Sequence, residues 1–210
     1  MEHTNTKSVG RNIKIVSFDL HGFNWGKSLL TDLCEHHDVI FCQEHWLSPE
    51  YLYKIDAVST DFACFSKSSM ETAITGGVLL GRPFGGISVL IRNKYASDAK
   101  LIALEKRFIV LSIKNLLLLN VYWPNCGSTE EYKSYFLDIL CAVGEIIDQQ
   151  QNAQVALGGY FNFVFCETNW SYRMLREFCD EYKISPMPLS PSRLVLLATV
   201  IASRPFSITH

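Results

Sequence analysis

The sequence predicts an α+β domain from three observations. Residues 13–47 have the order strand, helix, strand. Several apolar runs then follow one another between residues 78 and 121 without helical periodicity between them, which is typical of antiparallel sheet. A long amphipathic pattern begins near residue 130 and predicts a helix. This succession favours α+β over a purely parallel α/β arrangement.

Composition indicates a globular chain of one domain. Hydrophobic residues make up 48% of the 210 residues and charged residues 19%, which leaves enough apolar surface for a substantial core. The net charge is −2 and the sequence pI is about 6.3, so no strong basic field attracts nucleic acid from a distance. A nucleic-acid substrate is still compatible with these values, because a local groove or a bound metal can hold phosphate.

Cysteine usage and hydropathy predict an intracellular protein, nuclear or cytoplasmic. The seven cysteines are scattered and form no Cys-x-x-Cys pair of the kind that binds zinc. Residues 1–12 form a polar lead without the apolar segment of a signal peptide. The late apolar run from Leu194 to Ala202 is shorter than the roughly 20 residues that span a bilayer. We therefore expect no membrane insertion.

The first third predicts two strands that each end in an acidic or amide side chain. Ile13 to Phe18 alternates as a strand does, and Asp19 stands at its end. A loop is expected next, at Gly22, Asn24 and Gly26. One helical face is then predicted from the spacing of Leu29, Leu30, Leu33 and Cys34. The second strand is the apolar run from Asp38, which ends at Gln43 and Glu44.

Glu44 has two interpretations on this evidence. A carboxylate at the end of a buried strand is costly unless a positive charge meets it. Spacing alone favours a glutamate at the rim, paired with a lysine. The alternative is a ligand for a divalent cation, since Mg²⁺ takes oxygen donors and uses one or two protein carboxylates.

The middle of the chain predicts strands joined by turns. Ser48-Pro49-Glu50 has the pattern of a helix start. A glycine-rich segment, Gly81 to Gly86, precedes an apolar strand from Ile87 to Arg92. Lys114-Asn115 separates two further apolar runs, Phe108–Ile113 and Leu116–Val121, and this arrangement predicts a hairpin.

The last third predicts two helices around one more strand. Ser128 to Glu131 has the capping-box pattern and opens an amphipathic helix of about five turns. A strand at Gln154–Leu157 is followed by Gly158-Gly159, which permits close backbone approach. Asn169 to Tyr182 predicts a second helix. Three prolines then interrupt regular structure, and Leu194–Ala202 is open between a strand, a helix and unrelated sequence.

Four segments in this order resemble the endonuclease/exonuclease/phosphatase family, also called DNase-I-like. The resemblance is strongest to the branch found in non-LTR (LINE-type) retrotransposons, and it extends from Ile13 to Asn162. It rests on Ser17-Phe18-Asp19, on Gln43-Glu44-His45-Trp46-Leu47, on Gly81–Gly86 together with Asn120-Val121-Tyr122-Trp123-Pro124, and on Gly158-Gly159-Tyr160-Phe161-Asn162.

The resemblance implies a four-layer α/β sandwich that hydrolyses phosphodiesters of DNA with Mg²⁺ or Mn²⁺. Glu44 matches the metal-binding glutamate of the family. Asp19 stands where the family has asparagine, and both residue types offer an oxygen ligand. Tyr122 matches an active-site tyrosine that contacts phosphate, and Asn162 matches the asparagine beside the water-activating aspartate.

Two departures from the family pattern bear on activity. Tyr160 occupies the position of that aspartate, and a phenol with a pKa near 10 is a poor base for water at neutral pH. The late Ser-Asp-His motif is also absent, because no Asp or Glu follows Glu181 and the only late histidine is His210. We therefore interpret residues 13–182 as a C-terminally incomplete domain of this family and residues 183–210 as an atypical tail.

These observations leave two main hypotheses. The first is a metal-dependent DNA endonuclease whose activity is weakened or lost. The second is a non-catalytic remnant of the fold that at most binds nucleic acid or metal. A small-molecule phosphatase of the same family fits the motifs less well.

Several residues with functional chemistry also have ordinary structural interpretations. His36, His37 and His45 are expected at the surface or in loops rather than as zinc ligands. Trp46, Trp123 and Trp170 are expected to pack in the core or at its rim. Basic side chains that could contact a phosphate backbone are more often solvated surface: Arg82, Arg92, Lys94 and Lys100.

Overall fold

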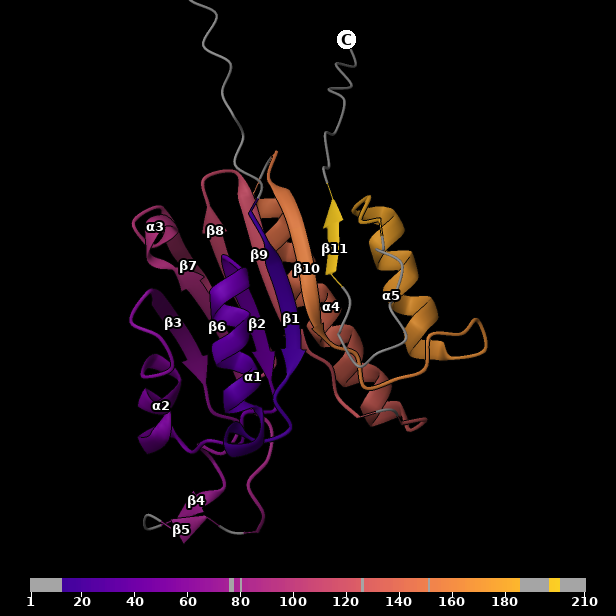
Figure 1. Ribbon diagram of the computed structural model, residues 1–210. Helices are drawn as coiled ribbons and strands as arrows, with labels where there is room; N and C mark the ends of the chain where they lie inside the picture. Colours follow the sequence, from indigo (N-terminus) through magenta and orange to yellow (C-terminus); the bar gives the residue numbers. More distant parts are fainter. Residues whose placement is uncertain are drawn as a thin grey trace, which may run out of the picture.

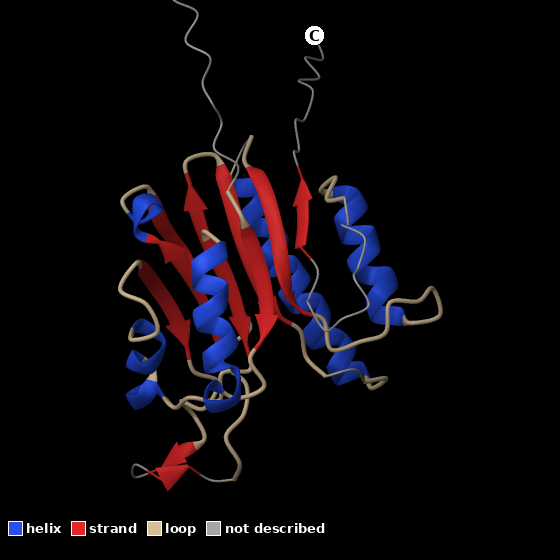
Figure 2. Ribbon diagram, viewed as in Figure 1, coloured by secondary structure: helices blue, strands red, loops and turns tan. Residues whose placement is uncertain are grey.

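A computed structural model defines the fold for residues 13–75, 78–79, 81–125, 127–150, 152–185 and 197–200, the last segment as backbone only. The chain forms two β-sheets packed face to face, with helices on both outer sides (Figure 1). The four layers are visible in Figure 2, where the two red sheets lie between blue helices. The predicted α+β, four-layer sandwich is therefore confirmed.

The first sheet has four strands in the order β1-β2-β6-β3. They are β1 (Ile15–Asp19), β2 (Val39–Gln43), β6 (Ile87–Arg92) and β3 (Phe62–Lys67). β1 and β2 are parallel, and the other two pairs are antiparallel. The helical connection between β1 and β2 is what allows them to run in the same direction.

The second sheet has the strand order β11-β10-β9-β8-β7. Its strands are β7 (Ala99–Leu104), β8 (Phe108–Ile113), β9 (Leu116–Tyr122), β10 (Gln154–Tyr160) and β11 (Leu197–Val200). β9 and β10 are parallel and are connected through the long helix α4. A separate short hairpin is formed by β4 (Ile74–Thr75) and β5 (Val78–Leu79).

The helices cover the outer faces of the sheets. α1 (Phe23–His36) packs on the first sheet together with the short elements η1 (Pro49–Tyr51) and α2 (Tyr53–Asp56), and α3 (Asn93–Ala96) follows the end of β6. α4 (Glu130–Gln149) and α5 (Trp170–Glu181) cover the second sheet. None of the helices in the described part of the chain combines the length and the apolar composition needed to cross a membrane.

The predicted hairpin and long helices are confirmed. Lys114 adopts a left-handed φ of 56° at the turn between β8 and β9, so this weak turn sequence still makes a tight connection. The predicted stripe of α4 is buried at Phe136, Ile139, Leu140 and Val143. Its N-cap is Thr129, whose Oγ1 accepts a hydrogen bond from Tyr132 N at 3.2 Å. The cap therefore lies one residue later than the Ser128 of the capping-box pattern.

The loop predicted at Gly22, Asn24 and Gly26 is found at Gly22, which precedes the helix with a φ of 93°, but it is wrong at Asn24 and Gly26, because α1 begins at Phe23. Gly26 serves close packing instead of a turn. A Cβ at Gly26 would lie 2.4 Å from Leu20 Cδ2 and 2.8 Å from the Leu20 carbonyl oxygen, so only glycine lets the helix start so near the end of β1. The helix predicted after Ser48 is limited to η1 and the single turn of α2.

Gly159 confirms the predicted close backbone approach at the end of β10. Its φ is 153°, and a Cβ there would lie 1.8 Å from the carbonyl oxygen of Val121 on β9. At the other edge of β10, Leu197–Val200 pairs antiparallel with it. Of the three alternatives for Leu194–Ala202, a strand is thus found at these four residues. Residues 186–196 and 201–210 lie outside the described part.

A buried amide pair joins the two sheets at the end of β2 and near the end of β9. Gln43 Nε2 donates to Asn120 Oδ1 at 2.6 Å and to Ser17 Oγ at 3.1 Å. Asn120 Nδ2 in turn donates to the carbonyl oxygens of Ser88 (2.8 Å) and Cys42 (3.3 Å). Because Gln43 and Asn120 are completely buried, these bonds satisfy groups that have no access to water. The pair fixes the relative position of the two sheets.

Replacing Asn120 with alanine should lower the free energy of unfolding by about 2–4 kcal/mol, because it leaves the buried Gln43 amide without its acceptor. Urea denaturation measures this loss. The double variant Gln43→Leu/Asn120→Leu should lose less than the sum of the two single leucine variants, because both polar partners are then removed together. Asn24→Ala on the exposed side of α1 is the control and should change stability little. Additive losses in the double variant would contradict the assigned pair.

Candidate active site

The carboxyl ends of four strands meet at one edge of the sandwich. Asp19 at the end of β1 is the register partner of Gln43, the last residue of β2. In the other sheet, Tyr122 and Tyr160 end β9 and β10 and are register partners. A hydrogen bond from the Tyr122 hydroxyl to Glu44 Oε1 connects the two pairs. Residues more than a hundred positions apart in the sequence are thereby brought to one place.

Glu44 lies in a strained turn that aims its carboxylate at this edge. Its φ is 56°, an uncommon value for a residue with a side chain. The backbone is held there because Glu44 N donates to the Gly86 carbonyl at 2.9 Å. Glu44 Oε2 accepts hydrogen bonds from Trp46 Nε1 at 2.5 Å and from Gly85 N at 3.1 Å. Together with Tyr122, three protein donors hold the carboxylate.

The lysine partner that spacing alone favoured for Glu44 is not found among the described residues. The donors are a phenol, an indole and a backbone amide, and the salt bridges of the described part do not include Glu44. The carboxylate is half-buried rather than at a solvated rim. The lysine-paired interpretation is therefore not supported among these residues, and the interpretation as a metal ligand stays a prediction.

Tyr122 is held protonated by its surroundings. Burial and the hydrogen bond to the Glu44 carboxylate raise the pKa of the Tyr122 phenol well above its usual range, with a smaller opposing effect from Arg107. Tyr122 therefore acts as a hydrogen-bond donor at neutral pH. The guanidinium of Arg107 lies 4.6 Å from the centre of the Tyr122 ring, and Arg107 Nε donates to the Tyr135 hydroxyl at 3.1 Å. A cation thus stands next to the carboxylate and phenol.

Tyr160 occupies the end of β10, where the family resemblance places an aspartate. Its ring stacks on Tyr122 with centroids 6.2 Å apart and planes inclined by 17°. It belongs to the apolar cluster between the sheets, together with Tyr122 and Phe41. An aromatic ring therefore fills space that a carboxylate would leave polar and hydrated.

Asn162 lies beside this group rather than in contact with Glu44. Its Nδ2 donates to the Trp123 carbonyl at 2.8 Å, and Trp123 N donates to the Tyr160 carbonyl at 3.0 Å. Trp123 itself is 1% exposed and stacks on Phe136, which confirms its interpretation as a packing residue. The structure thus places Asp19, Glu44, Tyr122, Tyr160 and Asn162 at one edge of the sandwich, and their chemical roles stay predictions.

His45 lies in a loop, as predicted, but the alternative of a surface position is wrong. The side chain is completely buried, and burial lowers its pKa to about 4. His45 Nδ1 accepts from Leu47 N at 3.0 Å, so the neutral ring carries its proton on Nε2, which lies 3.1 Å from the Lys67 carbonyl. Both ring nitrogens are therefore occupied. His45 supports the turn that carries Glu44 and has no free nitrogen for catalysis.

The donor set is compatible with a hydrated Mg²⁺ or Mn²⁺. Asp19 and Glu44 supply two carboxylates at neighbouring strand ends, and Mg²⁺ commonly takes one or two carboxylates and keeps several waters. A carboxylate has roughly four acceptor positions, so three donors leave one on Glu44 for a metal. Within the described segments, no group of three or more His, Cys, Asp or Glu side chains could enclose an ion.

Sequence reasoning did not identify Arg107. The signal was present in the hairpin register: pairing Ile113 with Leu116 and counting along both strands brings Arg107 opposite Tyr122. The structure confirms this neighbour relation, since Tyr122 N donates to the Arg107 carbonyl at 2.7 Å. The role of Trp46 as a donor to Glu44 was not foreseen either, because it depends on the left-handed turn between them.

Comparison with known proteins gives structural matches only. No family model and no curated protein matches the sequence. The fold is similar to the 3′ phosphatase NExo from Neisseria bound to a product DNA hairpin (TM-score 0.61, 12% identity, covering 90% of this chain and 87% of that one). The 3′-5′ exonuclease NExo from Neisseria meningitidis gives a TM-score of 0.61 at 12% identity, with 89% and 87% of the two chains covered.

An AP endonuclease from Archaeoglobus fulgidus is similar to the same extent. Its TM-score is 0.60 at 12% identity, with 90% of this chain and 87% of that chain covered. The chain has the DNase-I-like fold. At this level of identity the likeness concerns the arrangement of helices and strands.

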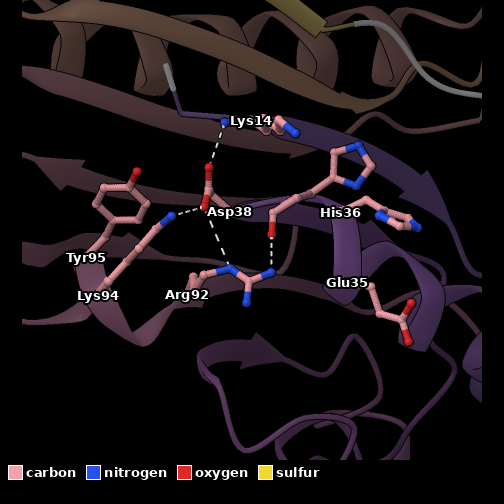
Figure 3. A pocket seen from close by; sticks show the side chains of 8 residues that line it. Lys14, Glu35, His36, Asp38, Arg92, Lys94 and Tyr95 are labelled. Carbon is pink, nitrogen blue, oxygen red and sulfur yellow. Dashed lines mark hydrogen bonds and ion pairs between the residues drawn. The ribbon is translucent and has the colours of Figure 1, made fainter. Parts of the chain in front are cut away.

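A second charged cluster lies at the opposite end of the first sheet. An open cavity of about 550 Å³ is lined there by residues from before β1, from the end of α1 up to the start of β2, and from the end of β6 and α3: Lys14, Glu35, His36, His37, Asp38, Arg92, Lys94 and Tyr95. In Figure 3, Asp38 is the centre of the cluster. Its Oδ1 lies 2.6 Å from Lys94 Nζ and 3.6 Å from Arg92 Nε, and its Oδ2 accepts from Lys14 N at 3.0 Å.

This cluster gives a structural role to Arg92 and Lys94, two of the four basic residues considered above as phosphate contacts. Arg92 also donates from one terminal nitrogen to the carbonyl oxygens of Cys34 and His37, the latter at 2.9 Å, and so ties the end of α1 to the sheet. Burial alone would raise the pKa of Asp38, but the hydrogen bonds from Lys94 and Lys14 N and the charges of Lys94 and Arg92 outweigh it and lower that pKa. We therefore interpret the cluster as structural.

Asp38→Asn should lower the free energy of unfolding at pH 7 by about 1–3 kcal/mol, because the variant loses a charge-assisted network. Since the pKa of Asp38 is lowered on folding, its contribution is present above the unfolded pKa of about 3.9 and is lost as pH falls through the folded pKa. Urea denaturation between pH 7 and pH 2 should show the two proteins converging at acid pH. A matched control is Asp98→Asn in the exposed pair with Lys114, which should cost less than about 1 kcal/mol. A pH-independent difference would contradict this assignment.

Proposed function

We propose that this chain is a nucleic-acid-binding protein derived from the endonuclease of a non-LTR retrotransposon, in which phosphodiester hydrolysis has been weakened or lost. The observation that carries the proposal is the stack of Tyr160 on Tyr122 beside the Glu44 carboxylate. The groups suited to hold a phosphate are together at this edge, whereas the position of the water-activating base is taken by an aromatic ring.

Phosphate binding is supported by the donors and charges of the site. Arg107 places a guanidinium over the Tyr122 ring, and guanidinium groups bind phosphate with two parallel hydrogen bonds. Asp19 and Glu44 would hold Mg²⁺, which when bound polarises the phosphate and stabilises the leaving oxygen. Asn162 stands next to the Trp123 backbone and orients the segment that follows β10.

Weak hydrolysis follows from the chemistry of the remaining groups. Activation of water needs a base with a pKa near the working pH, and a phenol is not one. Buried and fully hydrogen-bonded, His45 cannot replace the missing aspartate. General base catalysis contributes typically 10²–10⁴-fold to a rate, so its loss lowers activity by about that factor even where a metal ion still binds.

An active Mg²⁺-dependent DNA endonuclease is the second candidate. It is favoured by the adjacency of Asp19 and Glu44 and by the Tyr122 donor, which together resemble the metal and phosphate side of a nuclease site. The two candidates differ in whether the reaction occurs, and a direct assay separates them.

Incubation of the wild-type protein with supercoiled plasmid and about 5 mM Mg²⁺ or Mn²⁺ should give no nicking above the Glu44→Ala control, because the water-activating base is absent. Tyr160→Asp alone should also fail to restore robust nicking, since the late Ser-Asp-His motif is missing. Gel electrophoresis measures the conversion to open circles. Metal-dependent nicking by the wild type that Glu44→Ala abolishes would establish the active endonuclease instead.

Arg107→Gln should weaken the affinity for duplex DNA by about fivefold to twentyfold at low salt and should flatten its salt dependence, because one phosphate contact is lost. Fluorescence anisotropy with a labelled duplex in EDTA measures binding without hydrolysis. Lys100→Gln on the exposed edge strand β7 removes the same charge and should leave affinity nearly unchanged. Equal effects of the two variants would argue against a specific phosphate site.

A further inference from the structure

Three aromatic residues lie on separate segments whose backbones meet at the turn that carries Glu44. Trp46 belongs to the turn itself, and its ring lies 5.0 Å from that of His21. The start of α1 is fixed to the turn because Gly22 N donates to the Glu44 carbonyl at 2.7 Å and Phe23 N donates to the His45 carbonyl at 2.9 Å. Two residues past Phe23, Trp25 is 84% exposed.

The third segment brings Phe84. The next residue, Gly85, donates its N–H to the Glu44 carboxylate and accepts a hydrogen bond from Trp46 N at 2.8 Å. Phe84 is 46% exposed. We call Trp25, Trp46 and Phe84 the aromatic rim, because all three lie within a few residues of atoms that hydrogen-bond to the Glu44–Trp46 turn.

Packing does not account for the exposure of Trp25. The buried face of α1 consists of Phe23, Gly26, Leu30 and Cys34, and it is complete without this side chain. A fully solvated indole exposes a large apolar surface with no gain in folding free energy. Exposed aromatic residues with this property at a site edge are typical of binding surfaces.

Exposed cations lie on the same segments as the rim residues, and these segments also adjoin the carboxylates of Asp19 and Glu44. Lys27 lies two residues after Trp25, Arg82 lies two residues before Phe84, and both are exposed. Arg107 stands across the site on Tyr122. Aromatic rings that accept stacked bases, combined with cations that track a phosphate backbone, are the two components of single-strand nucleic-acid binding. A paired duplex keeps its base faces covered and offers such rings little to stack on.

We propose that the aromatic rim, with Trp25 as its most exposed member, stacks on unpaired bases, so that the preferred ligand is a single-stranded nucleic acid whose phosphate reaches Arg107. This inference rests on the proposed nucleic-acid-binding function and names its substrate class. A protein partner would also cover exposed aromatic side chains. Binding of a protein does not explain, however, why cations lie on both flanking segments and at the phosphate side of the site.

Fluorescence anisotropy in EDTA tests the proposal, with one labelled 12-nucleotide strand used alone and as the matching duplex. The wild type should bind the single strand more tightly than the duplex. Trp25→Ala and Phe84→Ala should each weaken single-strand binding by about tenfold, as expected for loss of one stacking contact, and should change duplex binding little. Trp25→Phe should retain most of the affinity, because an aromatic face remains.

Tyr53→Ala is the matched control, because Tyr53 is an exposed aromatic residue on α2 at 58% exposure. It should leave both affinities unchanged. The inference is overturned if the duplex binds as tightly as the single strand, or if Trp25→Ala and Phe84→Ala have no effect; binding that still depends on Arg107 would then leave the proposed function intact. Binding of neither form would overturn the proposed function and this inference together. Unchanged unfolding curves for the variants exclude a loss of folding as the cause.

Discussion

The hydrogen bond between Gln43 and Asn120 is the constraint on which the rest of the site depends. Here polar side chains from the two sheets form a hydrogen bond that is buried from solvent. The remaining polar atoms of both side chains are hydrogen-bonded to neighbouring residues. Glu44 follows Gln43 directly, and Tyr122 lies two residues beyond Asn120. Because a buried amide tolerates little displacement from its partner, this pair sets the separation at which the carboxylate and the phenol meet.

Glu44 is held in place by contacts within the folded chain. Its carboxylate is satisfied by Tyr122, Trp46 and a backbone amide, so the folded state does not require a cation to neutralise it. The same contacts connect the turn to the glycine loop at Gly85 and to the second sheet. Loss of these donors would leave a half-buried charge unsatisfied, so the contacts that position Glu44 also contribute to the stability of this edge.

The sequence predicted most of what is local and little of what joins the sheets. Hydrophobic periodicity located α4, and the two-residue turn at Lys114 located the hairpin, because both depend on neighbours along the chain. The grouping of Glu44 with Tyr122 was predicted from motif order alone. The Gln43–Asn120 pair and the burial of His45 were not, since each depends on segments that approach only after the sheets pack. The glycine at Gly26 misled the prediction because a close contact and a turn favour the same residue.

Tyr160 changes both the charge and the packing at this edge of the sandwich, compared with an aspartate at the same position. A carboxylate at this position would stand near Asp19 and Glu44, and like charges this close repel unless a cation lies between them. The phenol removes that repulsion and adds a ring that stacks on Tyr122 within the apolar cluster between the sheets. Active sites commonly hold strain or unfavourable charge that the rest of the fold must offset. With Tyr160 in place, the edge is stabilised by packing between aromatic rings, while the Glu44 carboxylate keeps its place beside the Tyr122 hydroxyl.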